Sequence, residues 1–141
     1  MPFTELRFLV AEDHDFQRRT VVRMLENLGA KKVYEAPDGR VALTIIQDAT
    51  SPVDIVISDL DMPDMDGMEF IRHLAESKAP VSVILTSALE RDLVASVARM
   101  ARSYEIRLLG VCEKPLSPAK LEPLIALYHA ARAEPDRPRA C

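Results

Sequence analysis

The sequence predicts an α/β protein built on a five-stranded parallel sheet with helices on both faces. Five apolar runs of strand length are spread along the 141 residues. Each is followed by a segment whose apolar residues recur every three or four positions, as in an amphipathic helix. Because strands that alternate with helices pair in parallel through right-handed crossovers, the five β-then-α units are expected to form one sheet.

The expected strands are continuous apolar runs rich in Val and Ile. They are LRFLVA at 6–11, KVYEA at 32–36, DIVISD at 54–59, VSVILTS at 81–87 and IRLLGVC at 106–112. Continuous apolarity, without alternation, is typical of strands buried on both faces. The runs therefore favour a sheet with helices above and below it.

The expected helices lie between and after these strands. The first spans 16–28 and ends before Gly29, a stop signal. The second follows the PDG turn and the third follows Gly67. The fourth spans about 90–104, and the fifth follows the SP pair at 117–118. Their apolar stripes comprise Val41, Leu43 and Ile45; Phe70, Ile71 and Leu74; Leu93, Val97, Met100, Ala101 and Tyr104; and Leu121, Leu124, Ile125 and Tyr128. The tail AEPDRPRAC has two prolines and no stripe, so we expect one domain over 1–131 and a linker or disordered tail over 132–141.

Composition narrows the class of protein. With 48% hydrophobic and 28% charged residues, the chain fits a soluble globular domain and excludes a disordered one. A net charge of -4 argues against direct nucleic-acid binding. The apolar runs are too short to span a bilayer, so a cytoplasmic protein without membrane contact is expected. Cys112 and Cys141 make neither a disulfide framework nor a metal-ligand spacing.

Polar side chains gather where the expected strands end. The residues delivered there are Glu12, Asp13, Asp59, Thr86 or Ser87, and Lys114. In open parallel sheets, ligands bind outside the carboxyl ends of the strands, where the strand order reverses. Two carboxylates about 4 Å apart repel by roughly 4 kcal/mol at an effective dielectric near 20, so this edge needs a cation unless the carboxylates splay into water.

The residue types suit a hard cation and a phosphoryl group. Mg²⁺ typically takes one or two carboxylates together with waters and phosphate oxygens. Asp13 and Asp59 supply those carboxylates in this interpretation, and Glu12 orders a coordinated water. One oxygen of Asp59 stays free to attack phosphorus, while Lys114 and a strand-four hydroxyl bind the transferred oxygens.

Four segments together resemble the receiver domain of bacterial two-component response regulators, the chemotaxis-regulator-like family. They are FLVAEDHDFQRRTVVRMLENLGAKKVYEAPDGRVAL, DIVISDLDMPDMDGMEFIRHL, VILTSA and CEKP, and the resemblance covers residues 6 to about 130. It implies a flavodoxin-like (βα)5 three-layer sandwich with strand order 2-1-3-4-5. It also implies a signalling switch, not an enzyme with its own substrate, which takes part in its own phosphotransfer and dephosphorylation.

The resemblance assigns roles residue by residue. Glu12 and Asp13 match the acidic pair, Asp59 matches the acceptor of a phosphoryl group from a sensor histidine kinase, and the backbone carbonyl of Asp61 completes the Mg²⁺ shell. Ser87 matches the switch hydroxyl because it directly precedes an alanine, and Thr86 is the alternative. Lys114 matches the lysine of a Lys-Pro pair whose peptide bond is usually cis.

Two departures bear on the partner. Val111 stands where an aromatic switch residue is usual, and the segment from Ser87 to Lys114 is longer than in the common receiver, which suggests a longer fourth helix. This lengthening, with LLGVCEKPLSP, is similar to receivers placed ahead of EAL-type cyclic-di-GMP phosphodiesterase domains. An EAL-type output domain or a second copy is therefore the expected partner of the face formed by helix four, strand five and helix five.

Other polar residues are expected to have structural or surface roles. Asp61, Asp64 and Asp66 belong to turn chemistry as side chains. The three histidines lack a mutual metal spacing. Arg18 and Arg19 are expected on the exposed side of the first helix, where the family docks its kinase.

Three other functions fit parts of this pattern. An EF-hand with Gly67 at its sixth position would place Met62 and His73 where Asp and Glu are required, so it fails. An aspartyl-phosphate phosphatase would carry its DLD motif after the first strand, whereas here a strand and an acidic pair precede it. A pseudo-receiver that serves only as an interaction module is the remaining alternative, against which the intact set of Asp59, Ser87 and Lys114 argues.

Overall fold

The fold is a parallel sheet whose strands alternate with helices. The computed structural model describes residues 5–48, 50, 52–60, 65, 67–78, 80–88, 91–131 and 139–140. Its elements are β1 (Arg7–Ala11), α1 (Asp15–Asn27), β2 (Lys32–Ala36), α2 (Gly39–Gln47), β3 (Ile55–Asp59), α3 (Gly67–Ser77), β4 (Ser82–Ser87), α4 (Arg91–Ser103), β5 (Arg107–Glu113), α5 (Pro118–Ala131) and β6 (Arg139–Ala140). The strand order is β2-β1-β3-β4-β5-β6, and all neighbours are parallel. The predicted fold class and the order 2-1-3-4-5 are confirmed.

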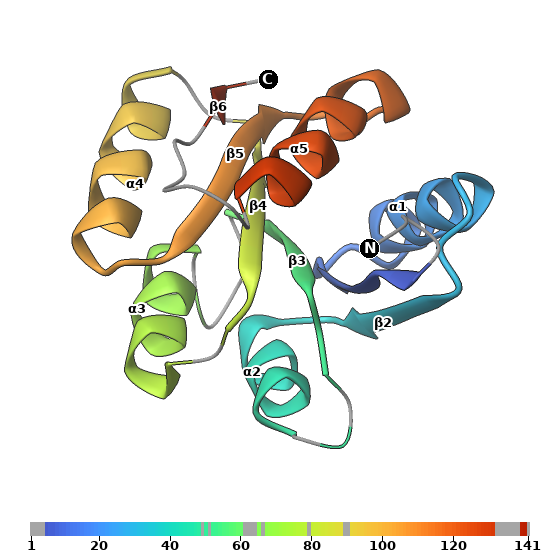
Figure 1. Ribbon diagram of the computed structural model, residues 1–141, viewed down its shortest axis with the longest axis horizontal. Helices are drawn as coiled ribbons and strands as arrows, with labels where there is room; N and C mark the ends of the chain where they lie inside the picture. The colour runs from blue at the N-terminus through green and yellow to red at the C-terminus, as the bar shows by residue number, and fades with distance from the viewer. Residues whose placement is uncertain are drawn as a thin grey trace.

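Helices cover both faces of the sheet. In Figure 1, α1 and α5 lie on one side, and α2, α3 and α4 lie on the other. Alternate residues of the central strands enter two separate cores: Ile57 packs with residues of α1 and α5, whereas Val56 packs with residues of α2, α3 and α4. Every residue of β3 and β4 is buried, as expected for strands covered on both faces.

The start of α1 positions the loop that carries the acidic pair. Its N-cap, His14, has extended backbone and makes no side-chain capping hydrogen bond. At the other end, Gly29 has a φ of 109°, a conformation that glycine adopts without steric cost, and its N–H donates to the carbonyl of Glu26. The predicted stop at Gly29 is therefore explained by its backbone geometry.

The segment between Ser87 and Lys114 contains α4 and β5. Helix α4 is 13 residues long, the same length as α1. The register between β4 and β5 also shifts, because Val83 pairs with Leu108 while Ile84 pairs with Gly110. Leu109 is the extra residue, and its side chain is fully buried on the α1–α5 face. Leu109 thus marks a β-bulge or similar irregularity between β4 and β5, and the longer fourth helix stays a prediction.

The described part of the tail contains a short strand that the sequence did not predict. Residues Arg139 and Ala140 pair in parallel with Gly110 and Val111 of β5. A two-residue strand has no apolar periodicity by which it could be recognised.

Cys112, at the end of β5, is disulfide-bonded, so the expectation that the cysteines form no disulfide is wrong for this residue. The domain boundary at residue 131 stays a prediction.

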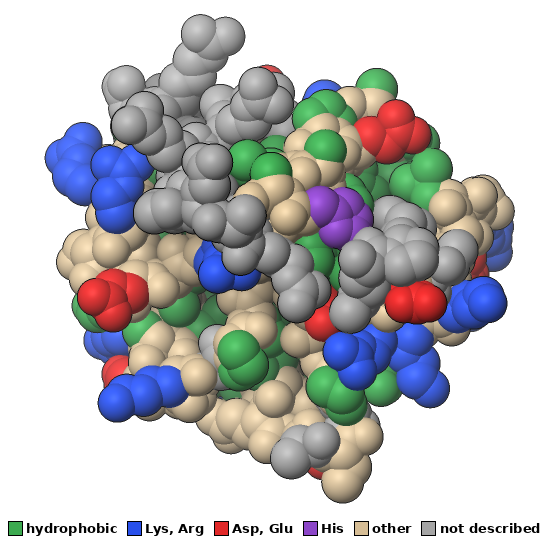
Figure 2. Space-filling model, viewed as in Figure 1, with side chains coloured by type: hydrophobic (Ala, Val, Ile, Leu, Met, Phe, Trp, Pro, Cys, Tyr) green, Lys and Arg blue, Asp and Glu red, His purple; other side chains and the backbone are tan. Residues whose placement is uncertain are grey.

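The surface carries charges of both signs. On the face shown in Figure 2, the described Lys and Arg side chains stand in separate groups with Asp and Glu side chains between them. Within the described ranges, none of the helices has the length and apolarity needed to cross a membrane.

Candidate functional site

The carboxyl ends of the central strands bring the predicted polar residues to one edge of the sheet. Asp59, the last residue of β3, pairs in register with Thr86 of β4. Ser87 ends β4, and its carbonyl accepts a hydrogen bond of 2.9 Å from the backbone N–H of Lys114. Because parallel strands end at the same edge, these residues and the loop after β1 surround one site.

The ammonium group of Lys114 lies at the centre of this site. Its Nζ donates to Asp59 Oδ2 at 2.8 Å, to Glu12 Oε1 at 2.9 Å and to Gln17 Oε1 at 3.0 Å. These three bonds use all three of its donors. Gln17 was not predicted, because a single polar residue on an exposed helix face carries no signal in the sequence.

Burial and charge set the protonation of this cluster. The Glu12 and Asp59 side chains are only 7% and 3% exposed. Burial raises the pKa of Glu12, and Asp13 and Asp59 add to the rise, while Lys114 opposes it. Burial also lowers the pKa of Lys114, but the bonds to Asp59 and Glu12 outweigh it, so the net direction is upward. Lys114 is therefore charged at neutral pH, and its ammonium pairs with two of the three clustered carboxyl groups, those of Glu12 and Asp59.

The remaining acidic groups fit a hard cation. Glu12, Asp13 and Asp59 each offer an oxygen, and the three oxygens lie within 4.8 Å of one another. Asp13 Oδ1 is buried and accepts no hydrogen bond. A buried carboxylate oxygen without a donor is costly unless a cation binds it, and oxygen ligands of this kind are those that Mg²⁺ prefers. The predicted ligand Asp61 lies outside the described residues, as do Asp64 and Asp66.

Glu12 differs from Asp13 in being held at four points. Its N–H donates to the carbonyl of Ala36 at 3.0 Å, and its carbonyl accepts from the Arg18 guanidinium at 2.9 Å. Its carboxylate accepts from Lys114 and, at 3.3 Å, from the N–H of His14. Glu12 is thus fixed before any ligand arrives, whereas the buried Asp13 oxygen is left to accept one.

Both candidate hydroxyls lie at this edge. Thr86 lines a cavity of about 400 Å³ together with Glu12 and Lys114. Ser87 is 1% exposed and is the last residue of β4. Neighbouring strand residues point to opposite faces, so the two hydroxyls are not equivalent.

The loop that carries Lys114 is held by a second lysine. Lys120, on α5, donates from Nζ to the carbonyl of Glu113 at 2.9 Å and to the carbonyl of Pro115 at 3.0 Å. These carbonyls flank Lys114. The Lys114–Pro115 peptide bond is cis, as the family resemblance implied.

The expectation for the two arginines of α1 is half right. Arg19 is exposed, with 67% of its side chain accessible, whereas the Arg18 side chain is only 14% exposed. Arg18 folds back over the loop before α1 and pairs with Asp15 and Glu35. The prediction was wrong for Arg18 because consecutive helical residues point about 100° apart, and only one of them faces the loop.

Comparison with known proteins defines the class of this site. The sequence model of the family described as the response regulator receiver domain matches residues 8–126. The chain is 36% identical to cyclic di-GMP phosphodiesterase RocR of Pseudomonas aeruginosa over 135 residues, which are 96% of this chain and 34% of RocR. It is 32% identical to transcriptional regulatory protein PdtaR of Mycobacterium tuberculosis, covering 86% of this chain and 55% of PdtaR.

A solved structure agrees with these relatives. A chain of the CheX–CheY–BeF3–Mg²⁺ complex from Borrelia burgdorferi superposes with a TM-score of 0.73 at 25% identity, covering 87% of this chain and 89% of that chain. The protein therefore belongs to the response regulator receiver domain family of two-component signal transduction. It spans about a third of RocR and about half of PdtaR.

Proposed function

We propose that the chain accepts a phosphoryl group on Asp59 from a histidine kinase, in a Mg²⁺-dependent transfer, and that phosphorylation switches an interaction surface. The observation that carries this proposal is the cluster itself. Three carboxylates offer oxygens within 4.8 Å of one another, the Lys114 ammonium lies 2.8 Å from Asp59 Oδ2, and a buried Asp13 oxygen accepts no hydrogen bond. We propose that the chain acts in the cytoplasm, where a kinase can reach it.

The transfer follows from the residues around Asp59. Its carboxylate oxygen attacks phosphorus, a new P–O bond forms, and the P–N bond to the kinase histidine breaks. The electron pair leaves with the imidazole nitrogen, which then takes a proton. Asp13 and Asp59, with the Asp61 backbone carbonyl, would hold Mg²⁺, which would supply positive charge to the phosphoryl oxygens. Glu12 would order a coordinated water.

Lys114 and a hydroxyl complete the proposed site. The ammonium already faces Asp59, so it needs little reorganisation to follow the oxygens of the incoming phosphoryl group. Ser87 is proposed as the hydroxyl that donates to one of those oxygens, with Thr86 as the alternative. Hydrolysis of the aspartyl phosphate by water resets the switch. The protein therefore takes part in its own phosphorylation and dephosphorylation and transforms no other substrate.

The proposed responsive surface is the face formed by α4, β5 and α5. The phosphoryl group adds nearly two negative charges, and a Ser87 bond to it requires the loop after β4 to close inward. We infer that this face binds an output domain of the EAL type or a second copy of the chain. The similarity to RocR, itself a cyclic di-GMP phosphodiesterase, supports the first partner.

Transfer from a phosphorylated histidine kinase tests the function. Label should move from the kinase to wild-type protein in the presence of Mg²⁺, and neither to an Asp59→Asn variant nor to wild-type protein in chelator. A pseudo-receiver would take no label under any condition. Label that reached Asp59→Asn as readily as wild type would assign the acceptor to another residue.

A further inference from the structure

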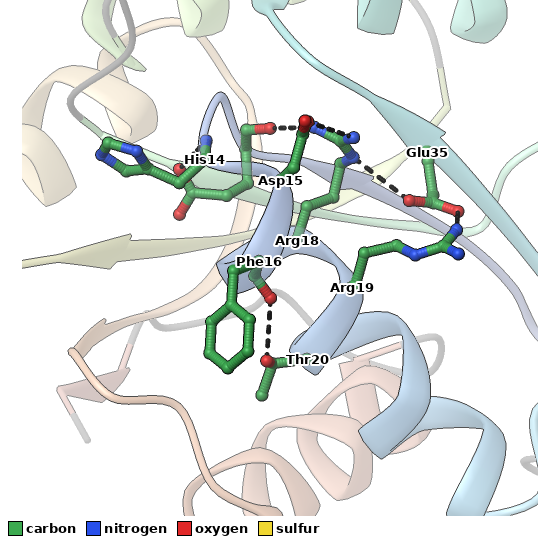
Figure 3. A network of polar contacts seen from close by, with 8 residues as sticks. His14, Asp15, Phe16, Arg18, Arg19, Thr20 and Glu35 are labelled. Carbon is green, nitrogen blue, oxygen red and sulfur yellow. Dashed lines mark hydrogen bonds and ion pairs between the residues drawn. The ribbon is translucent and has the colours of Figure 1, made fainter.

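Arg18 joins both ends of the loop that carries Asp13. Its Nη1 donates to the carbonyl of Glu12 at 2.9 Å, where the loop leaves β1, and its Nη2 donates to Asp15 Oδ1 at 2.7 Å, where α1 begins. Its Nε donates to Glu35 Oε1 at 3.1 Å on the neighbouring strand β2. Figure 3 shows Arg18 between Asp15 and Glu35. The side chain of Phe16, which follows Asp15 in α1, points away from this group.

Three anchors of this kind constrain the loop strongly. A guanidinium is planar and presents its donors in a fixed fork, so acceptors that bond to it are held in one relative arrangement. The Arg18 side chain is 14% exposed, which limits competition from water. The Glu12 N–H also bonds to β2, at the carbonyl of Ala36. Asp13 therefore sits in a short loop whose two ends are tied to one side chain and to one strand.

The loop needs such a restraint because its acidic groups repel one another. Glu12, Asp13 and Asp59 place oxygens within 4.8 Å. Lys114 bonds to two of these carboxylates, while Asp13 Oδ1 accepts no hydrogen bond. Without a tie on the backbone, the Asp13 end of the loop would relax away from Asp59, and a cation would have to restore the arrangement at a cost in affinity.

We propose that Arg18 is a positioning residue that holds the β1–α1 loop in the geometry that binds the divalent cation. This inference rests on the proposed function. Arg18 touches neither the acceptor nor the cation in this account. It acts through the Glu12 carbonyl and the Asp15 carboxylate. Groups that orient metal ligands typically change metal affinity by 10- to 100-fold when they are removed.

Arg19 provides a matched control on the same helix. It also carries a guanidinium and also bonds to Glu35, through Oε2 at 3.4 Å. It is 67% exposed, and no hydrogen bond of the described residues joins it to Glu12 or Asp15. Replacing Arg19 removes one positive charge from the same face of the molecule but leaves the loop restraint in place.

The test is Mg²⁺ binding by titration calorimetry on the full chain, with Mg²⁺ alone as the ligand. Arg18→Met should weaken Mg²⁺ binding by about tenfold or more. Arg19→Met should leave it within about twofold. Arg18→Lys keeps the charge but has no fork, so it should recover only part of the affinity. Phosphorylation of Arg18→Met by a small phosphodonor should be slow at low Mg²⁺ and approach the wild-type rate at saturating Mg²⁺.

The outcomes separate positioning from general stability. If Arg18→Met proves unfolded, Glu35→Ala removes the β2 acceptor of Arg18 and should raise the Mg²⁺ dissociation constant several-fold. It also removes the acceptor of Arg19, and Arg19→Met controls for that second loss. Equal Mg²⁺ affinity in wild type, Arg18→Met and Arg19→Met would overturn the proposal, as would a slow rate that saturating Mg²⁺ does not restore. Wild-type protein that binds no Mg²⁺ would instead contradict the proposed function.

Discussion

Lys114 Nζ lies 2.8 Å from Asp59 Oδ2, although 55 residues separate the two in the chain. The same nitrogen lies 2.9 Å from Glu12 Oε1. The proposed acceptor is therefore neutralised in part before any phosphoryl group or cation is present. The Lys114 ammonium thus offsets the negative charge of Asp59 and Glu12, so we expect its removal to affect both the site and the stability of the fold.

Replacing Lys114 should destabilise the metal-free protein. In Lys114→Met, Asp59 and Glu12 lose the cation that faces them, and removing one partner of a buried ion pair typically costs about 3 kcal/mol. Added Mg²⁺ should recover a larger share of stability in Lys114→Met than in wild type, because it supplies the missing positive charge. Chemical denaturation with and without Mg²⁺ measures both effects. Equal metal-free stability of the two proteins would mean that the carboxylates splay into water.

Glu12 should make stability depend on pH. Its pKa is raised above the ordinary value of 4.5, so the fold favours its protonated form. That contribution is present below pH 4.5 and is lost as pH rises through the raised pKa. Glu12→Gln stays neutral, so the metal-free variant should gain stability relative to wild type across this window. The difference between the two unfolding free energies, measured from pH 4 upward, checks the sign; a difference that moves in wild type's favour would refute it.

The two hydroxyls at the end of β4 should differ in effect. Ser87→Ala should slow phosphorylation of Asp59 about tenfold, because a hydrogen bond to a charged group is typically worth about 1.5–3 kcal/mol. Thr86→Val should change the rate little if Ser87 is the donor. Initial rates with a small phosphodonor at saturating Mg²⁺ decide between them. The reverse ranking would assign the hydroxyl to Thr86.

Phosphorylation should be reported by α4 and the loop after β4. The residue at position 111 is a valine, so it has no aromatic ring that could swing outward. Its side chain is 3% exposed and packs in the core beside α4. Hydrogen exchange should change across residues 88–131, and light scattering should detect any second copy. Unchanged exchange over this range would mean that the signal leaves through another face.

Most of the fold could be predicted from the sequence. Buried parallel strands are continuous apolar runs, and β3 and β4 begin within one residue of their predicted starts at 54 and 81. β6 could not be found, since its strand character comes only from pairing with Gly110 and Val111. The bulge at Leu109 was also missed, because a register shift depends on the partner strand.

The site was predictable where strand ends carry its residues. Glu12 directly follows an apolar run, Asp59 ends one, and Lys114 lies two residues beyond one. The structure brings all three into contact. Gln17 and Arg18 come from a helix face, and nothing in their sequence spacing shows that they turn toward the loop. Their contribution depends on side-chain direction, which only the packed structure determines.

Site-resolved mass spectrometry decides whether Asp59 is a Mg²⁺-dependent phosphoacceptor. Wild-type protein and Asp59→Asn are incubated with a small phosphodonor, with Mg²⁺ or with chelator, and the intact mass and the modified peptide are measured. We expect one phosphoryl group, on the peptide that contains Asp59, in wild type with Mg²⁺ alone. Equal labelling of Asp59→Asn, or labelling that chelator does not affect, would contradict the account.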